Sequence, residues 1–304
     1  MSSSDPPIYP SFEPETIEYC RRNEDAFPLV FGWACYVVRV CRMLVPLPQE
    51  SAAAANLTRA HFLAVSGLIL RCSNLAEAIL RLAVDNDHGD GIRILARSVS
   101  ESAVKAMWLA TGDASRFQRY SAEGMKAELE LCSRTEASIA ARGWALPIET
   151  QLLSATRRSI ERAGLTDAEI NAGKKLPDLA TMYEDVGIGR LSYVAGHKLG
   201  SHATHGTWME LVVNYLGEGP DGIGLDMSPV KPDPRSLFDT FMAIVESLGT
   251  IIVNLHDTRD GRAVLAYVRS AEQGLFDSMA VAYPQDFGWA ADELRRRRSQ
   301  HEEE

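Results

Sequence analysis

The side chains best suited to chemistry gather between Leu176 and Gly217, a stretch that holds three of the seven histidines, His197, His202 and His205. On a helix, Arg190, Tyr193 and His197 would follow one another at one-turn spacing and share one face. A neutral histidine can act as a general base, and an arginine can hold or stabilise a phosphate. This spacing therefore predicts a polar site. The structural alternative is that His197 is a core residue satisfied by a carboxylate, for which Glu101 would serve.

A second candidate pair lies about 90 residues upstream, where Arg97 and Glu101 stand four residues apart on one predicted helix. On an open surface such a pair contributes only a few tenths of a kcal/mol. A functional role requires this face to be buried against the histidine-rich stretch. Trp108, further along the same side of the helix, indicates that the face is not fully solvated. The two stretches are thus expected to form opposite walls of one polar site.

His202 and His205 would be neighbours on a helix and would be able to share a metal ion, with His197 or an acid as a third ligand. Glycines at positions 196, 200 and 206 weigh against a regular helix here. Several common signatures are absent: there is no GxxxxGK[ST], GxSxG, HExxH or CxxC motif. No cofactor is expected, and the metal site remains a minor alternative.

The composition of the 304 residues describes an acidic globular chain with a net charge of −10 and 46% apolar residues. A broad basic surface for nucleic acid is not the default for such a chain. The five cysteines are an odd number, which favours free thiols and a cytoplasmic location. The N-terminus does not have the pattern of a secretory signal. The longest apolar run, residues 27–38, is about 12 residues against the ~20 of a bilayer span, so no membrane partner is expected.

The elements that must position these residues are nearly all helical in period. Helices are predicted over 15–23, 26–44, 57–84, 91–110, 115–142, 148–163, 177–186, 236–255 and 261–280, with a further short one opening at 166. The fold expected is all-α, a single multi-helix bundle of roughly eight to ten helices. A disordered arm is expected over 1–14, the helical domain over 15–283 and a charged tail over 284–304. Residues 218–235, rich in glycine and proline, are expected to form a long loop.

Several short motifs carry a resemblance to an uncharacterised, all-helical bacterial family that is known only as a domain of unknown function. The matching pieces are Arg97-Ser-Val-Ser-Glu101, the aromatic Trp108, Arg119-Tyr120, and the stretch Pro177–His197 with its LSYVAGH sequence. The resemblance covers roughly residues 60–216. It implies a helical fold in which Arg97, Glu101, Ser192 and His197 are shared polar residues, and it supplies no activity.

The chain also bears a fainter similarity to the HEPN ribonucleases, which are small helical dimers. Their signature is an arginine and a histidine separated by four to six residues, and six residues separate Arg190 from His197. The family usually has a polar residue directly after the arginine, where this chain has Leu191. The similarity implies a metal-independent endoribonuclease or phosphodiesterase that acts on RNA as a homodimer, with Arg190 and His197 as the catalytic pair.

The interpretation favoured by the sequence is a non-enzymatic module that binds a protein partner or a small ligand. In this interpretation Arg97, Glu101, Ser192, Tyr193 and His197 belong to a buried polar network that fixes helix packing. The ribonuclease stands as the first alternative and the metal site as the second. The sequence does not specify a substrate.

Overall fold

The protein is mostly helical, with 76% of its residues in helices. The computed structural model describes residues 6–52, 54–85, 87–190, 193–194, 199–219 and 222–302. Within these ranges it has thirteen α-helices and one two-stranded hairpin. The α-helices are α1 (Pro14–Asn23), α2 (Phe27–Leu44), α3 (Arg59–Val84), α4 (Gly89–Ala110), α5 (Ala114–Arg142), α6 (Pro147–Ala163), α7 (Asp167–Ala172), α8 (Leu179–Asp185), α10 (Leu199–His205), α11 (Trp208–Asn214), α12 (Pro234–Leu255), α13 (Arg259–Ala282) and α14 (Pro284–Glu302).

The predicted count of eight to ten helices is wrong, and the helices beyond it are short or polar. Helices α10 and α11 have seven residues each and are separated by Gly206, whose φ of 54° is left-handed. Segments of this length contain too few turns to show a helical period. Helix α14 lies in the segment that the sequence sets apart as a charged tail. It packs on α13, where the Gln273 side-chain amide donates to the Ala291 carbonyl.

The expected all-α class also needs a correction, because β1 (Leu216–Gly219) and β2 (Gly222–Leu225) pair as an antiparallel hairpin. Half of the eight strand residues are glycine. Glycine is depleted in strands, so the pattern that signals a strand in a sequence is missing here. The hairpin occupies the stretch where a loop is expected.

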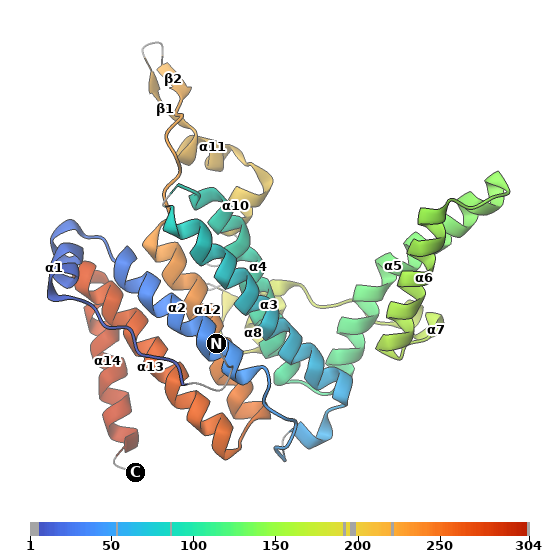
Figure 1. The fold of residues 1–304 in the computed structure, drawn as a ribbon, viewed down its shortest axis with the longest axis horizontal. Helices are drawn as coiled ribbons and strands as arrows, with labels where there is room; N and C mark the ends of the chain where they lie inside the picture. The colour runs from blue at the N-terminus through green and yellow to red at the C-terminus, as the bar shows by residue number, and fades with distance from the viewer. Residues whose placement is uncertain are drawn as a thin grey trace.

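Five long helices, α2, α3, α4, α12 and α13, pack into a central bundle around one apolar core (Figure 1). Each presents apolar side chains at three- and four-residue spacing to the others, as Ile92, Val99, Ala103 and Ala106 of α4 do. Polar side chains cap the start of several helices. The Thr58 hydroxyl accepts a hydrogen bond from the His61 N–H at the start of α3. Helix α4 is the main packing neighbour of α3.

Three of the bundle helices, α2, α3 and α12, are long and apolar enough to cross a membrane by length and composition. In this fold, between 44% and 61% of the apolar window in each of them is buried against the rest of the protein. The absence of a membrane partner therefore remains a prediction. All five cysteines are free, and four of them are buried.

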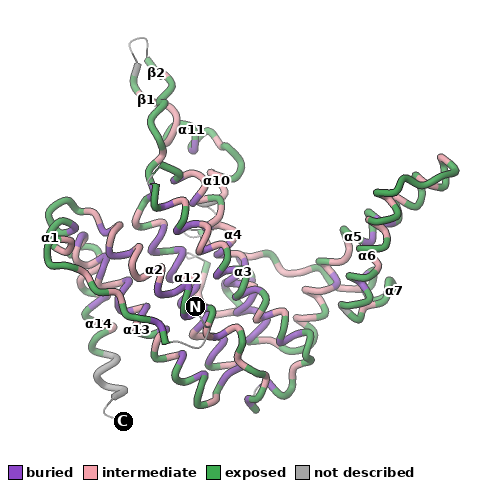
Figure 2. Tube along the Cα trace, viewed as in Figure 1, coloured by how far each residue is buried: buried purple, intermediate pink, exposed green. Residues whose placement is uncertain are grey.

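Two arms leave the bundle (Figure 1). One consists of α5, α6 and α7, which pack on one another and have few contacts with the core. The other, called the hairpin arm below, consists of α10, α11 and the β1–β2 hairpin, and it joins the bundle along α4. Figure 2 shows that both arms are largely exposed, in contrast to the buried interior of the bundle. The hairpin arm contains two of the three histidines singled out by the sequence.

Candidate functional site

One side of α4 carries charged residues at helical spacing: Asp90, Arg93, Arg97, Glu101 and Lys105, called the polar face of α4 below. The opposite side of the same helix lies in the core. The side chains of Arg97 and Glu101 are 20% and 30% exposed, so this face is half-buried. The sequence made burial of this face a condition for any role beyond a surface ion pair, and the structure shows partial burial.

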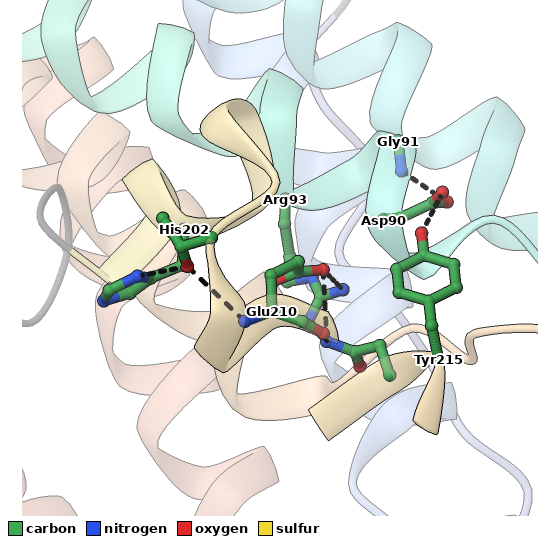
Figure 3. Close-up of polar contacts among 8 residues, drawn as sticks. Asp90, Gly91, Arg93, His202, Glu210 and Tyr215 are labelled. Carbon is green, nitrogen blue, oxygen red and sulfur yellow. Dashed lines mark hydrogen bonds and ion pairs between the residues drawn. The ribbon is translucent and has the colours of Figure 1, made fainter. Parts of the chain in front are cut away.

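Arg93 joins the polar face to α11 through Glu210 (Figure 3). The Arg93 Nη2 donates to Glu210 Oε1 at 2.6 Å, and the Asn214 side-chain amide donates to the same oxygen at 3.1 Å. The Glu210 side chain is only 8% exposed and that of Arg93 24%. The Arg93 Nε is buried and has no hydrogen-bond partner in the described part of the chain. Glu210 is therefore the main partner that compensates the positive charge of Arg93.

The first turn of α4 makes hydrogen bonds to the chain on both sides of the β1–β2 hairpin. The Tyr215 hydroxyl, just before β1, donates to Asp90 Oδ2 at 2.9 Å (Figure 3). After β2, the Val230 carbonyl accepts from the Gly89 N–H at 2.7 Å. Position 89 requires glycine, because a Cβ there would lie 2.3 Å from the Lys231 carbonyl oxygen.

Hydrogen bonding controls the charge of Asp90. Burial acts to raise the pKa of Asp90, but the Gly91 N–H and the Tyr215 hydroxyl both donate to the carboxylate, and the net pKa is lowered. The same bond raises the pKa of Tyr215, since the hydroxyl proton is held by a carboxylate. Asp90 is therefore ionised at neutral pH and holds Tyr215 as a donor.

Arg97 connects the polar face to α10. Its Nη1 lies 3.2 Å from His205 Nε2, and its Nε lies 3.4 Å from Glu101 Oε1. A guanidinium only donates, so Nε2 of His205 is the acceptor and its ring proton is on Nδ1. Lys105 lies 3.8 Å from the other oxygen of Glu101. The expected contact between the Arg97–Glu101 face and the histidine-rich stretch thus occurs, and His205 makes it.

His202 has a structural role at the start of α11. Its Nδ1 is 2.8 Å from the Thr207 hydroxyl, and the same hydroxyl caps α11 by accepting from the Glu210 N–H (Figure 3). His202 and His205 therefore bond to different partners. Among the residues that the structure describes, no group of three or more His, Cys, Asp or Glu side chains is placed to hold a metal. His197 lies outside those residues, so the three-histidine site remains a prediction.

Further along α4, two tyrosines approach the polar face. The rings of Tyr183 and Tyr193 are in edge contact, with centroids 5.9 Å apart. Burial first, and then the negative charges of Glu246 and Glu101 and the neighbouring Tyr193, raise the pKa of Tyr183 to about 12. Tyr193 packs against the main core. Tyr183 thus contacts the ring of Tyr193 and lies within electrostatic reach of Glu101, and the place of Tyr193 in the polar network remains a prediction.

At its C-terminal end, α4 is tied to α8 through Trp108. The indole is 1% exposed and donates from Nε1 to Asp185 Oδ2 at 2.8 Å. The Arg116 guanidinium lies over the indole ring, 4.9 Å from its centroid. The interpretation of Trp108 as a sign of burial is confirmed.

Arg190 points away from this network. Its side chain is 73% exposed and its Nη1 lies 3.7 Å from Glu184 on the surface. Ser192 and His197 lie outside the described residues. The catalytic pair Arg190–His197 and the roles of Ser192 and His197 in the network therefore remain predictions.

Helix α11 has the reverse of the usual amphipathic arrangement. Its one buried residue is the acid Glu210, whereas its apolar side chains face solvent. The exposed fractions are 64% for Trp208, 57% for Met209 and 65% for Val213. A surface helix normally buries its apolar stripe and exposes its charges. Here the polar contacts with α4 hold the helix, and the apolar side chains remain available.

Arg93, Glu210, Asp90 and Tyr215 were not singled out as site residues from the sequence. Arg93 had a signal, because it stands one turn before Arg97 on the same face. Glu210 had another, as the single acid within the apolar segment Trp208–Val213. Neither signal shows which partner the residue meets, since the paired positions are 117 residues apart.

The fold and the site together define a mostly helical protein in which a polar helix face holds an arm that exposes apolar side chains. The chain belongs to a family of unknown function, DUF5677, whose profile matches residues 62–223. No curated protein and no solved structure matches the chain. The matched region runs from α3 into β2, so it includes the polar face of α4 and most of the hairpin arm. This match confirms the predicted resemblance to a family known only as a domain of unknown function.

Proposed function

We propose that this protein is a non-enzymatic module that binds a protein partner through the hairpin arm. The polar face of α4 holds the arm in place, and the arm offers its apolar side chains to the partner. In this proposal the Arg–Glu–His network attaches the arm to α4 and is not a catalytic centre. Its role is to keep α11 in an orientation that apolar packing alone would not select.

The observation that supports the proposal is that α11 buries its acid, Glu210, and exposes its apolar side chains. Each exposed apolar side chain forgoes the stabilisation it would gain from burial, about 1.5–3 kcal/mol for a Val, Leu or Met. Contiguous exposed apolar surface of this kind marks interaction sites in soluble proteins. Trp208 in particular belongs to a residue type that is enriched at the centres of interfaces.

The polar contacts also support a fixed rather than a loose arm. Three separate contacts, Arg93–Glu210, Arg97–His205 and Asp90–Tyr215, join it to successive turns of one rigid helix. A preformed surface loses less conformational entropy on binding than a flexible one. The ribonuclease alternative gains no comparable support, because the one member of its catalytic pair that is described, Arg190, is paired with Glu184 on the surface.

Site-specific photo-crosslinking in the producing cells tests the proposal. A photoreactive amino acid at Val213 should give a discrete adduct with a protein, identified by mass spectrometry. Val253 on α12 is a matched control, because it is also a helical valine and is 64% exposed against 65% for Val213. An adduct at position 213 and none at 253 supports the proposal. The absence of an adduct at 213 contradicts it.

A further inference from the structure

We propose that α2 and α13 form a second binding surface, which takes an extended peptide of prolines and aromatic residues from a partner protein. The chain's own residues 7–12, Pro-Ile-Tyr-Pro-Ser-Phe, cover this surface and are called the strap below. The N-terminal segment, dark blue in Figure 1, crosses α13 before it reaches α1. The surface is built from elements other than the hairpin arm, so the inference does not depend on the proposed function.

The centre of the surface is a group of three rings, Trp33 and Tyr36 on α2 and Tyr267 on α13, called the aromatic surface below. The ring of Tyr9 in the strap stacks on Tyr36 with 5.4 Å between centroids, and it lies 6.4 Å from the ring of Tyr267. Trp33 meets Tyr36 edge to face at 5.3 Å. Ring contacts of this kind stabilise by about 0.5–1.5 kcal/mol beyond the area they bury. The aromatic surface therefore binds an aromatic side chain.

Two glycines let rings approach the helix backbones. A Cβ at Gly274 of α13 would lie 1.9 Å from the Trp33 indole, so glycine is required for Trp33 to lie against that helix. A Cβ at Gly32 of α2 would lie 2.7 Å from the ring of Phe12 in the strap. Glycine inside a helix costs about 0.5–1 kcal/mol relative to alanine. At Gly32 this cost makes room for the aromatic side chain of a bound peptide.

The strap is held by its side chains and not by its backbone. Among the residues that the structure describes, no backbone–backbone hydrogen bond joins residues 7–12 to the helices. Pro7 is buried, whereas Ile8 and Tyr9 are 74% and 52% exposed. Proline-rich peptides are bound in this way, by docking prolines and rings on an aromatic surface without a hydrogen-bonded ladder. The strap can thus leave the surface without breaking backbone hydrogen bonds.

The strap also leaves one polar group of the aromatic surface unsatisfied. Tyr36 is 2% exposed, and its buried hydroxyl makes no hydrogen bond of standard geometry in the described part of the chain. Burial first, and then the neighbouring Tyr9, raise the pKa of this hydroxyl, so it stays protonated and can donate. A buried donor without an acceptor costs about 1–3 kcal/mol. A partner peptide that brings an oxygen acceptor to this hydroxyl recovers that cost and displaces the strap.

The strap competes with any such peptide from within the same chain. It leads directly into α1, so its effective concentration at the surface is on the order of millimolar. A peptide of similar intrinsic affinity therefore binds the wild-type chain weakly. Loosening the strap should raise the observed affinity about tenfold or more.

Fluorescence anisotropy with a labelled synthetic peptide, PPIYPSFE, which has the sequence of residues 6–13, tests the inference on the full chain. Tyr9→Ala with Phe12→Ala loosens the strap, and this variant should bind the peptide at least ~10-fold more tightly than the wild type does. Gly32→Val, added to that variant, occupies the place of the Phe12 ring and should weaken binding at least ~10-fold. Gly67→Val is the matched control, because a Cβ at this helical glycine meets nothing within 4 Å, and it should leave the affinity unchanged.

An unlabelled peptide in which alanine replaces the tyrosine and the phenylalanine should not compete. Four results would overturn the inference: no binding to the loosened variant up to about 1 mM peptide, equal affinities for that variant and the wild type, equal effects at positions 32 and 67, or competition by the alanine peptide. Unfolding of the loosened variant, seen by circular dichroism, would also overturn it, because the strap would then be a required part of the fold. Crosslinking at Val213 reports on the hairpin arm alone, so either proposal can fail without the other.

Discussion

Replacing Glu210 with alanine is expected to release α11 from α4 while the helical bundle stays folded. The substitution removes the acceptor of Arg93 Nη2 and of Asn214, and it leaves Arg93 with Nε and Nη2 both unpaired. Breaking a fully buried pair costs about 3–5 kcal/mol. Arg93 is 24% exposed, and water can partly replace the lost partner. We therefore expect a cost of about 2 kcal/mol.

Hydrogen exchange read by mass spectrometry measures this cost where it falls. At 1.4 kcal/mol per tenfold, 2 kcal/mol corresponds to about a 30-fold loss of amide protection. The loss should be confined to peptides that cover α10, α11 and the hairpin, whereas α12 in the bundle serves as the internal reference. Glu130→Ala is a control, since Glu130 also pairs with an arginine but is 62% exposed, and its loss should cost less than about 1 kcal/mol.

A double replacement sharpens the same prediction. Arg93→Met with Glu210→Met removes both charges together, so no unpaired charge remains, and most of the protection should return. Unchanged exchange over α11 in Glu210→Ala would refute the reasoning. It would mean that the Arg93–Glu210 contact does not hold the arm.

Three further outcomes are expected. Asp185→Ala leaves the buried indole N–H of Trp108 without its acceptor and should lower the free energy of unfolding, measured in urea, by about 1–3 kcal/mol. Asp185→Asn keeps an acceptor oxygen and should lower it less. Equal losses in the two variants would contradict this role of Asp185. Gly89→Ala places a Cβ 2.3 Å from the Lys231 carbonyl and should lower the melting temperature, whereas Gly124→Ala on α5, where a Cβ meets nothing within 4 Å, should not; equal shifts would refute the close contact. Tyr215→Phe should destabilise the protein by about 1 kcal/mol at pH 7. Because the folded pKa of Asp90 is lowered, this difference should persist above the unfolded value of ~3.9 and disappear as pH falls through the folded pKa, so a difference that is independent of pH would contradict the Asp90–Tyr215 bond.

The long helices and one wall of the site were accessible from the sequence because each depends on local spacing. The stripe of Ile92, Val99 and Ala103 defines the buried side of α4, and the repeat of Arg97 and Glu101 defines its polar side. Trp108 signalled that this polar side is not fully solvated. These inferences need only the period of one helix.

The residues that face α4 from the other side of the site were harder to predict, because their positions depend on contacts between short elements that are distant in the sequence. The sequence weighted Arg190, Tyr193 and His197 as one stripe, but Arg190 faces Glu184 on the surface while Tyr193 packs inward. His205, considered only as a metal ligand, proved to be the partner of Arg97. The hairpin was missed because its glycines lack strand propensity.

The central claim is that the polar face of α4 holds the arm so that α11 can bind a protein. Photo-crosslinking at Val213, repeated with Glu210→Ala in the same chain, tests it most directly. If the claim holds, the yield of the adduct at position 213 falls about tenfold or more when Glu210 is replaced, at equal protein levels. This fall is in line with the ~2 kcal/mol by which the replacement weakens the attachment of the arm to α4. An adduct of undiminished yield would contradict the claim, because binding would then not depend on the network that holds the arm.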